Sequence, residues 1–126
     1  MRTKNVIESF RFALAGLLYV LRTQRNARLQ VLIAAAVVAA GLLLSLSAMD
    51  WAILSLTLGL VIAAEAANTA VEAVVDLVSP EFHPLGKVAK DASAAAVLVL
   101  AVTSIAVGLL ILGPPLLSVL RSSLAG

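Results

Sequence analysis

Carboxylate and amide side chains recur inside one apolar stretch of the sequence, at Glu65, Asn68, Glu72 and Asp76. On a helix turning about 100° per residue, the four fall within an arc of about 80°, and the rise from Glu65 to Asp76 is about 16 Å. Such a ladder of oxygen ligands suits Mg²⁺, which commonly takes one or two carboxylates together with substrate phosphates and water. Glu65, at the deep end, suits a general base that takes the proton of a lipid hydroxyl.

A purely structural explanation of this ladder is the alternative. Polar groups also join helices in lipid, through interhelical hydrogen bonds or pairing with arginines. For Asp76 alone, both explanations stand. Ionised side chains are costly in a bilayer and usually mark a functional site, so the aligned group of Glu65, Asn68 and Glu72 favours chemistry.

A polar segment follows the ladder and adds Glu81, His83, Lys90 and Asp91. The ammonium of Lys90, next to the carboxylates, is suited to receive phosphate oxygens. His83 is the one histidine and the chain has no cysteine, so a transition-metal site is not expected. Neither a GxxxxGK[ST] loop nor a GxSxG elbow is present.

Composition places these residues in a membrane protein. The chain has 126 residues, of which 62% are hydrophobic, and a mean hydropathy of +1.09, whereas soluble domains are roughly 45–50% apolar. We therefore predict one all-α membrane domain. The net charge of +2 gives no reason to expect a nucleic-acid partner, and without cysteines the chain has no disulfides or thiol nucleophiles.

Three helices are predicted to cross the bilayer, whose hydrocarbon is about 30 Å thick. In the second helix only about 14 uncharged residues precede Glu65, so this helix is expected to continue toward Val78. Asp50 and Trp51 are expected to form a short turn, and Gly113, Pro114 and Pro115 to end or kink the third helix. The predicted parts are a surface helix and basic linker at 1–28, membrane spans at 29–49, 52–78 and 92–112, a cytoplasmic loop at 79–91 and a loosely ordered tail at 113–126.

The amino-terminal segment is predicted to be an amphipathic helix in the membrane interface. Its apolar residues recur at intervals of three and four, at Val6, Ile7, Phe10, Leu14, Leu17, Leu18 and Leu21. A lengthened first span is the alternative, which the arginine cluster at 22, 25 and 28 disfavours. Six basic residues lie in segment 1–28, none in the turn at 47–51 and two in the loop at 79–91. This distribution predicts a cytoplasmic amino terminus and a cytoplasmic active site.

The segment that contains the ladder and the polar residues after it resembles a known family. The segment EAANTAVEAVVDLVSPEFHPLGKVAKDASAAAVL is similar to the signature of the small bacterial diacylglycerol kinase and undecaprenol kinase family. The pattern E-x-x-N-[ST]-A-x-E-x-x-x-D, then E-x-H and A-K-D, covers Glu65 to Asp91 without a gap, and SFRFALAGLLYVLRTQRNARLQ resembles the family's surface helix. The resemblance implies a homotrimer in the bacterial inner (plasma) membrane, with active sites between chains. It also implies Mg²⁺-dependent transfer of the γ-phosphate of ATP to a lipid alcohol.

The resemblance also implies roles for single residues. Glu65 would be the catalytic base, Asn68 would orient the substrate or the base, and Asp76 would support the site. Glu72 would bind the metal and contact the nucleotide. The other residues assigned to the nucleotide are Glu81, His83, Lys90 and Asp91.

Two positions depart from the family pattern. Gln24 stands where many members have a glutamate that serves as a second metal ligand, and an amide there removes a negative charge and should weaken the site. A shifted register is the alternative at that position. Phe12 stands where some members have a tyrosine near the nucleotide, which removes a hydroxyl contact.

The lipid acceptor is expected to be undecaprenol, because RNAR and LVSPEFHPLGKVAKD resemble the undecaprenol kinases more closely. Diacylglycerol, which would give phosphatidic acid, is the alternative, and the Ala, Leu and Val residues of a lipid groove do not separate the two. Two hypotheses come from other classes. One is a small membrane transporter with Glu65 as its coupling site, and the other is a noncatalytic membrane scaffold.

Overall fold

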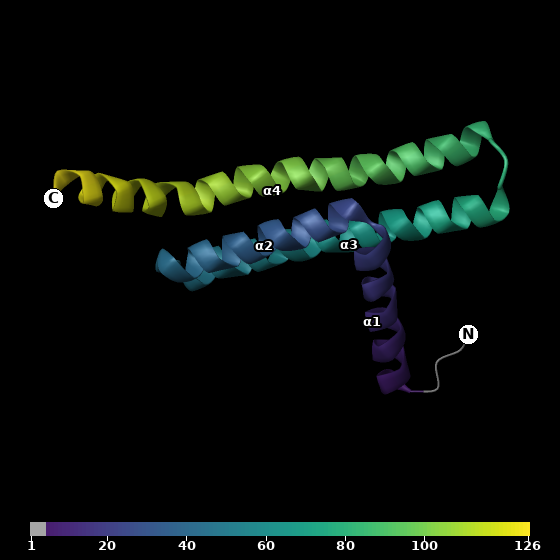
Figure 1. Cartoon of the computed structure of the whole chain (residues 1–126), viewed down its shortest axis with the longest axis horizontal. Coiled ribbons are helices and arrows are strands. Elements are labelled where there is room, and N and C mark those ends of the chain that lie inside the picture. The colour runs from purple at the N-terminus through teal and green to yellow at the C-terminus, as the bar shows by residue number, and fades with distance from the viewer. Residues whose placement is uncertain (1–4) are drawn as a thin grey trace.

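The computed structural model describes residues 5–126 as four helices joined by short connections (Figure 1). Arg2 and Lys4, which belong to the basic amino-terminal segment, lie outside the described residues. The helices are α1 (Val6–Thr23), α2 (Arg25–Leu43), α3 (Ala48–Val78) and α4 (Pro84–Ala125). Three of them, α2, α3 and α4, are long and apolar enough to cross a membrane. The predicted all-α architecture with three candidate membrane spans is therefore confirmed.

Helices α2, α3 and α4 lie side by side, and α1 extends away from them at a steep angle from the corner where α2 begins (Figure 1). α3 packs most extensively along α4, and less extensively against α2 and α1. With 31 residues, α3 is about 46 Å long, and its carboxyl-terminal turns project beyond the beginning of α2 (Figure 1). The polar ladder of Glu65, Asn68, Glu72 and Asp76 thus lies in the part of α3 that contacts both the α1–α2 corner region and the first turns of α4.

The turn between α2 and α3 lies earlier in the chain than expected, because α2 ends at Leu43 and α3 begins at Ala48. Asp50 is therefore in the first turn of α3, where it forms a capping box with Ser47. Ser47 Oγ accepts from the Asp50 backbone N–H at 3.1 Å, and Asp50 Oδ2 accepts from the Ser47 backbone N–H at 3.1 Å. An acidic residue at this position interacts favourably with the partial positive charge of a helix amino terminus, which explains why Asp50 lies in the first turn of a helix and not in a loop.

Gly41 near this turn allows close packing of α2 against the start of α3. A Cβ atom at Gly41 would lie 2.8 Å from Trp51 Cη2 and 2.9 Å from Leu46 Cδ1. We predict that Gly41→Ala lowers the free energy of unfolding by about 1–3 kcal/mol, because the indole ring has to move. Thermal unfolding in detergent measures this change. Gly59→Ala in α3 is the matched control, since its Cβ would meet nothing within 4 Å; equal stability of the two variants would contradict the prediction.

Helix α4 begins earlier and ends later than the predicted third span. Pro84 occupies its first turn, where a proline needs no hydrogen-bond acceptor, and His83 Nδ1 accepts from the Leu85 N–H at 3.2 Å. Lys90 and Asp91 therefore lie on a rigid helix, and the irregular loop is confined to 79–83.

At its other end, α4 does not stop at Pro114 and Pro115 but continues to Ala125, so the expectation of a loosely ordered tail was wrong. Each of these prolines removes one backbone donor. Helices in apolar surroundings tolerate this loss where local adjustments satisfy the freed carbonyl groups.

Candidate active site

The four residues of the ladder differ in exposure along α3. Glu65 is 3% and Asn68 8% exposed, Glu72 is half-buried, and the Asp76 side chain is 67% exposed. Each of the four side chains contacts a side chain on another helix or at the corner between α1 and α2. Asn68 and Glu72 also contact each other within α3. The ladder thus runs from a buried carboxylate to an exposed one, as its spacing predicted.

Glu72 belongs to a hydrogen-bond network that joins α3 to α4 and to the corner between α1 and α2. Gln24 Nε2 donates to Glu72 Oε2 at 3.4 Å, and Asn68 Nδ2 donates to Glu72 Oε1 at 3.1 Å. From α4, Ser93 Oγ lies 2.7 Å from Asn68 Oδ1 and 2.9 Å from the Lys90 carbonyl oxygen. The fold therefore brings together Glu72 and Gln24, the two residues predicted to hold a metal.

Gln24 is placed by the backbone as well as by its side chain. It is the residue between α1 and α2, with φ −101° and ψ 115°, and its own N–H donates to the Val20 carbonyl at 2.8 Å. The Arg28 guanidinium stabilises the same corner, because it donates to the Leu21 and Arg22 carbonyls at 3.2 Å and 3.0 Å. These hydrogen bonds hold the corner between α1 and α2 in which Gln24 lies.

The donor set around Glu72 consists of one carboxylate and two amides, whose N–H groups face the carboxylate oxygens. Among residues 5–126, the ion pairs are Lys87 with Asp91 and Lys90 with Asp76, so Glu72 is not neutralised by a cation in this part of the chain. The described residues contain no group of three or more His, Cys, Asp or Glu side chains that could hold a metal. One carboxylate and two rotatable amides are a set that Mg²⁺ completes with phosphates and water.

The deep end of the site is enclosed by apolar side chains. Glu65 Oε2 accepts from Gln30 Nε2 at 3.5 Å, and the Glu65 backbone carbonyl accepts from Thr69 Oγ1 at 2.9 Å. A cavity of about 10 Å³ adjoins the carboxylate and is otherwise lined by Leu17, Val20, Leu21, Ala27, Gln30, Val31 and Ile62. A carboxylate with one amide neighbour in such surroundings is suited to exchange a proton with a lipid hydroxyl.

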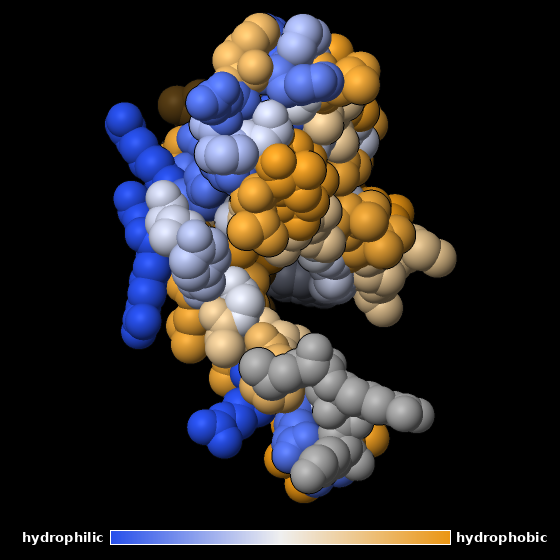
Figure 2. All heavy atoms as spheres, turned by 90° about the vertical axis from the view of Figure 1, so that its right-hand side faces the viewer, coloured by the Kyte–Doolittle hydropathy of each residue, from blue (hydrophilic) through white to orange (hydrophobic). Residues whose placement is uncertain are grey.

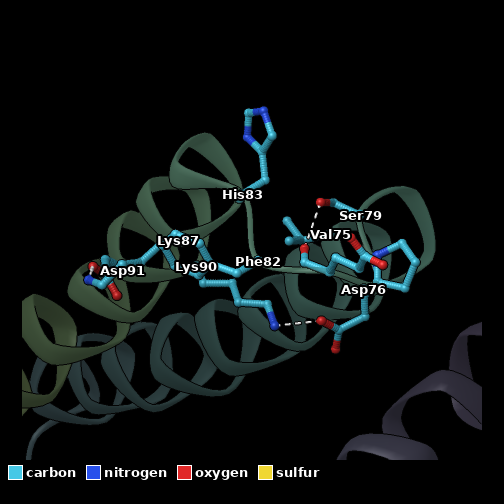
Figure 3. Close-up of a pocket in the computed structure, with 11 residues that line it drawn as sticks. Val75, Asp76, Ser79, Phe82, His83, Lys87, Lys90 and Asp91 are labelled. Carbon is cyan, nitrogen blue, oxygen red and sulfur yellow. Dashed lines mark hydrogen bonds and ion pairs between the residues drawn. The ribbon is translucent and has the colours of Figure 1, made fainter.

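The shallow end of the site is a pocket of about 390 Å³ between the last turns of α3 and the first turns of α4 (Figure 3). Lys90 Nζ lies 2.5 Å from Asp76 Oδ1, and Lys87 pairs with Asp91 one helical turn further on. The pocket gathers the predicted residues Asp76, Glu81, His83, Lys90 and Asp91.

Two predicted nucleotide residues are less closely integrated into this pocket. The His83 ring points away from the pair of Lys90 and Asp76 in Figure 3, and its Nδ1 caps α4. Phe12, on α1, is not among the residues that line the pocket.

The surface around this end is divided by polarity. Figure 2 looks at the end where α3 and α4 are joined, and hydrophilic side chains gather along the top and one side, beside broad apolar areas. Polar and apolar surface therefore lie directly next to each other at this end of the molecule.

Two polar residues of the site were not identified from the sequence. Gln30 contacts Glu65 and Ser93 contacts Asn68. A weak signal exists for each: Gln30 is an amide one residue inside the predicted first span, and Ser93 follows Lys90 by three residues and so shares its helix face.

Comparison with known proteins gives a consistent result. The family described as "Prokaryotic diacylglycerol kinase" matches residues 11–112. The chain is 47% identical over 117 residues to the "Diacylglycerol kinase" of Synechocystis sp., which covers 92% of this chain and 67% of that protein. It is 44% identical over 109 residues to the "Undecaprenol kinase" of Bacillus subtilis, which covers 86% of this chain and 89% of that protein. The "Diacylglycerol kinase" of Pseudomonas aeruginosa is 36% identical over 93 residues, 74% of this chain and 76% of that protein.

Proposed function

Because this chain belongs to the prokaryotic diacylglycerol kinase family, and so is an ATP-dependent lipid kinase of the membrane, we propose that it phosphorylates undecaprenol with Glu65 as the base. The observation that carries this proposal is the single face of α3, which leads from the buried carboxylate of Glu65 past Glu72 to the pocket beside Lys90. Because the family consists of lipid kinases, we no longer favour the transporter and scaffold hypotheses.

Undecaprenol is proposed as the acceptor because the sequence segments RNAR and LVSPEFHPLGKVAKD resemble the undecaprenol kinases more closely. The Bacillus subtilis relative, which is 44% identical, is named for undecaprenol, and the Synechocystis relative, which is 47% identical, is named for diacylglycerol. Diacylglycerol, named in two of the three relatives, stays the second candidate.

A groove between α1 and α3 supports binding of a lipid next to Glu65. It has a volume of about 460 Å³ and is lined mainly by small and apolar residues, among them Gly16, Ala66 and Ala70. Leu17 and Val20 line both this groove and the small cavity beside Glu65. A chain held in the groove would place its hydroxyl near the carboxylate after a small movement of these two side chains.

In the proposed reaction, the lipid hydroxyl oxygen attacks the γ-phosphorus of ATP. A new oxygen–phosphorus bond forms, the bond from the γ-phosphorus to the bridging oxygen breaks, and ADP leaves. Glu65 takes the hydroxyl proton and later releases it to water. Asn68 holds the Glu72 carboxylate in place, while Lys90, released from Asp76, neutralises phosphate charge; such positioning and electrostatics account for most of the catalysis of phosphoryl transfer.

Magnesium is proposed to bind at Glu72 with the Gln24 amide oxygen, which would require rotation of that amide. When bound, the ion would neutralise charge on the phosphates. Glu81, His83 and Asp91 are proposed to hold the nucleotide around the pocket, with Phe12 as a more distant contact on α1.

The membrane arrangement is proposed from charge and exposure. Apolar side chains of α1 are left exposed in the single chain, for example Val6 at 83% and Phe10 at 72%. An amphipathic helix in the interface would cover them. The distribution of basic residues supports an amino terminus and a pocket at the cytoplasmic face of the bacterial inner membrane, and a homotrimer would complete each site with a neighbouring chain.

The acceptor is tested by measuring Mg²⁺-dependent ATP consumption in mixed micelles, with undecaprenol and diacylglycerol supplied in parallel. We expect turnover with undecaprenol and formation of undecaprenyl phosphate. Turnover with diacylglycerol alone would reassign the acceptor and keep the catalytic residues. No turnover with either lipid would contradict the proposed function.

Gln24 provides a prediction about the metal. Gln24→Glu adds a second carboxylate beside Glu72, and we expect the Mg²⁺ concentration for half-maximal activity to fall by about tenfold, since affinity rises with the number of charged ligands. The measurement is a Mg²⁺ titration of activity at saturating ATP and lipid. Gln24→Met, which removes the oxygen, is the matched variant and should shift the titration in the opposite direction; a Gln24→Glu titration that coincides with the wild type would argue against Gln24 as a ligand.

A further inference from the structure

Gln30 is a half-buried residue of α2 with an unusual feature. Its Oε1 atom is buried and has no hydrogen-bond partner within residues 5–126, whereas its Nε2 donates to Glu65 Oε2 at 3.5 Å. Most buried polar atoms in proteins have a partner, and an orphaned acceptor calls for an explanation. The amide therefore has an unused hydrogen-bond acceptor, and its N–H group contacts the buried carboxylate.

Few side chains near Gln30 could donate a hydrogen bond to its Oε1 atom. It borders the cavity of about 10 Å³ next to Glu65, and a cavity of about 120 Å³ between α2, α3 and α4. In the larger cavity the other polar side chain is Ser104, whose hydroxyl donates to the Ala101 carbonyl of its own helix at 2.7 Å. Of the side chains around Gln30, Glu65 is the one that gains a proton in the proposed reaction.

We propose that Gln30 is a positioning residue that holds Glu65 in both of its protonation states. A carboxamide has two N–H donors and a carbonyl acceptor, and a half-turn of the terminal torsion exchanges them. The N–H group donates to Glu65 Oε2 in the structure, which is the contact that suits the ionised carboxylate. After Glu65 has taken the hydroxyl proton, its O–H donates to Gln30 Oε1. The inference rests on the proposed role of Glu65 as the base.

This arrangement gives Gln30 a definite part in the reaction without any covalent change to it. The proton moves from the lipid hydroxyl to Glu65 and stays on Glu65 until it is released to water, and no bond of the amide breaks. Because the carboxyl group keeps one partner throughout, it does not turn away from the acceptor lipid between turnovers. The orphaned atom of the resting state thus becomes satisfied in the protonated state.

The first test replaces Gln30 with methionine, which has a similar shape but neither the donor nor the acceptor. A hydrogen bond to a charged group corresponds to about a ten- to hundredfold effect, and we expect kcat to fall by that factor with an unchanged KM for ATP. Ser104→Ala is the matched control, since it removes a polar atom from the same larger cavity without touching Glu65; its kcat should stay within about twofold of the wild type. Wild-type kcat in Gln30→Met would overturn the inference.

The decisive readout is a double-mutant cycle with Glu65→Gln, because a structural role of Gln30 would persist without the base. If Gln30 acts through Glu65, the double variant has the same kcat as Glu65→Gln alone. A repeated loss in the Glu65→Gln background would overturn the inference about Gln30 and leave the proposed base in place. Full activity of Glu65→Gln would instead overturn the base, and the inference with it.

A second variant covers the case in which Gln30→Met does not fold. Gln30→Asn keeps the amide but withdraws it by one methylene group, so it preserves polarity at this position of α2. We expect a similar fall in kcat that again disappears in the Glu65→Gln background. Normal kcat in a folded Gln30→Asn protein would overturn the inference.

Discussion

Replacing Glu65 with glutamine is expected to lower kcat by about 10²- to 10⁴-fold, the range attributed to a positioned general base. Glutamine keeps the size of the side chain and can still hydrogen-bond Gln30, but it does not accept the proton of the lipid hydroxyl. KM for ATP and the Mg²⁺ titration should stay near the wild-type values, because the nucleotide pocket begins at Asp76, about 16 Å along α3. The measurement is steady-state kinetics in mixed micelles.

Asp50→Asn is the matched control on the same helix. Asp50 belongs to the capping box at the opposite end of α3, and its replacement should cost about 1 kcal/mol of stability without lowering kcat. Glu65→Gln should instead lower kcat without lowering stability, because it removes a buried ionisable group from apolar surroundings. A Glu65→Gln protein that is folded and turns over at the wild-type rate would show that another group takes the proton.

The second large effect is expected at Glu72. Glu72→Gln removes the one carboxylate of the network with Gln24 and Asn68, and we expect kcat/KM for ATP to fall at least about a hundredfold, comparable to the loss of one preorganised electrostatic contact to the transition state. Raising the Mg²⁺ concentration should restore part of this activity. The measurement is a Mg²⁺ titration at each of several ATP concentrations.

The response to Mg²⁺ separates the two acidic residues. Activity of Glu72→Gln should depend on Mg²⁺ over a higher range than that of the wild type, while Glu65→Gln should be insensitive to added metal. Equal Mg²⁺ dependence of the wild type and Glu72→Gln would rule out Glu72 as the metal ligand. The combination of Glu72→Gln with Gln24→Glu offers a further check, because it restores one carboxylate at the site from the other side.

The helices and the ladder were predictable because their signals are local. A helix of about twenty apolar residues and a polar face that repeats every three or four residues are both written in neighbouring positions of the chain. The ladder at Glu65, Asn68 and Glu72 follows from helix geometry alone, whatever packs against it. In the structure, Asn68 and Glu72 are in contact one helical turn apart, and Glu65 is buried on the same helix.

Helix ends and partners were harder to predict because they depend on competing or distant contacts. Asp50 and Pro84 were expected in a turn and a loop, but an acidic residue and a proline are also favourable in the first turn of a helix. The contacts of Gln30 with Glu65 and of Ser93 with Asn68 join residues 35 and 25 positions apart. No local pattern encodes such pairs, since they depend on how α2 and α4 are placed against α3.

Gln24 ends α1, begins α2 and contacts Glu72, so one residue joins an interfacial helix, a membrane span and the proposed metal site. There is no flexible linker at this corner to absorb movement. With α1 in the interface as proposed, membrane tension or bilayer thinning that tilts α1 would displace the Gln24 side chain relative to Glu72. The rate of the enzyme would then depend on the mechanical state of the membrane that contains its substrate, and not on substrate concentration alone.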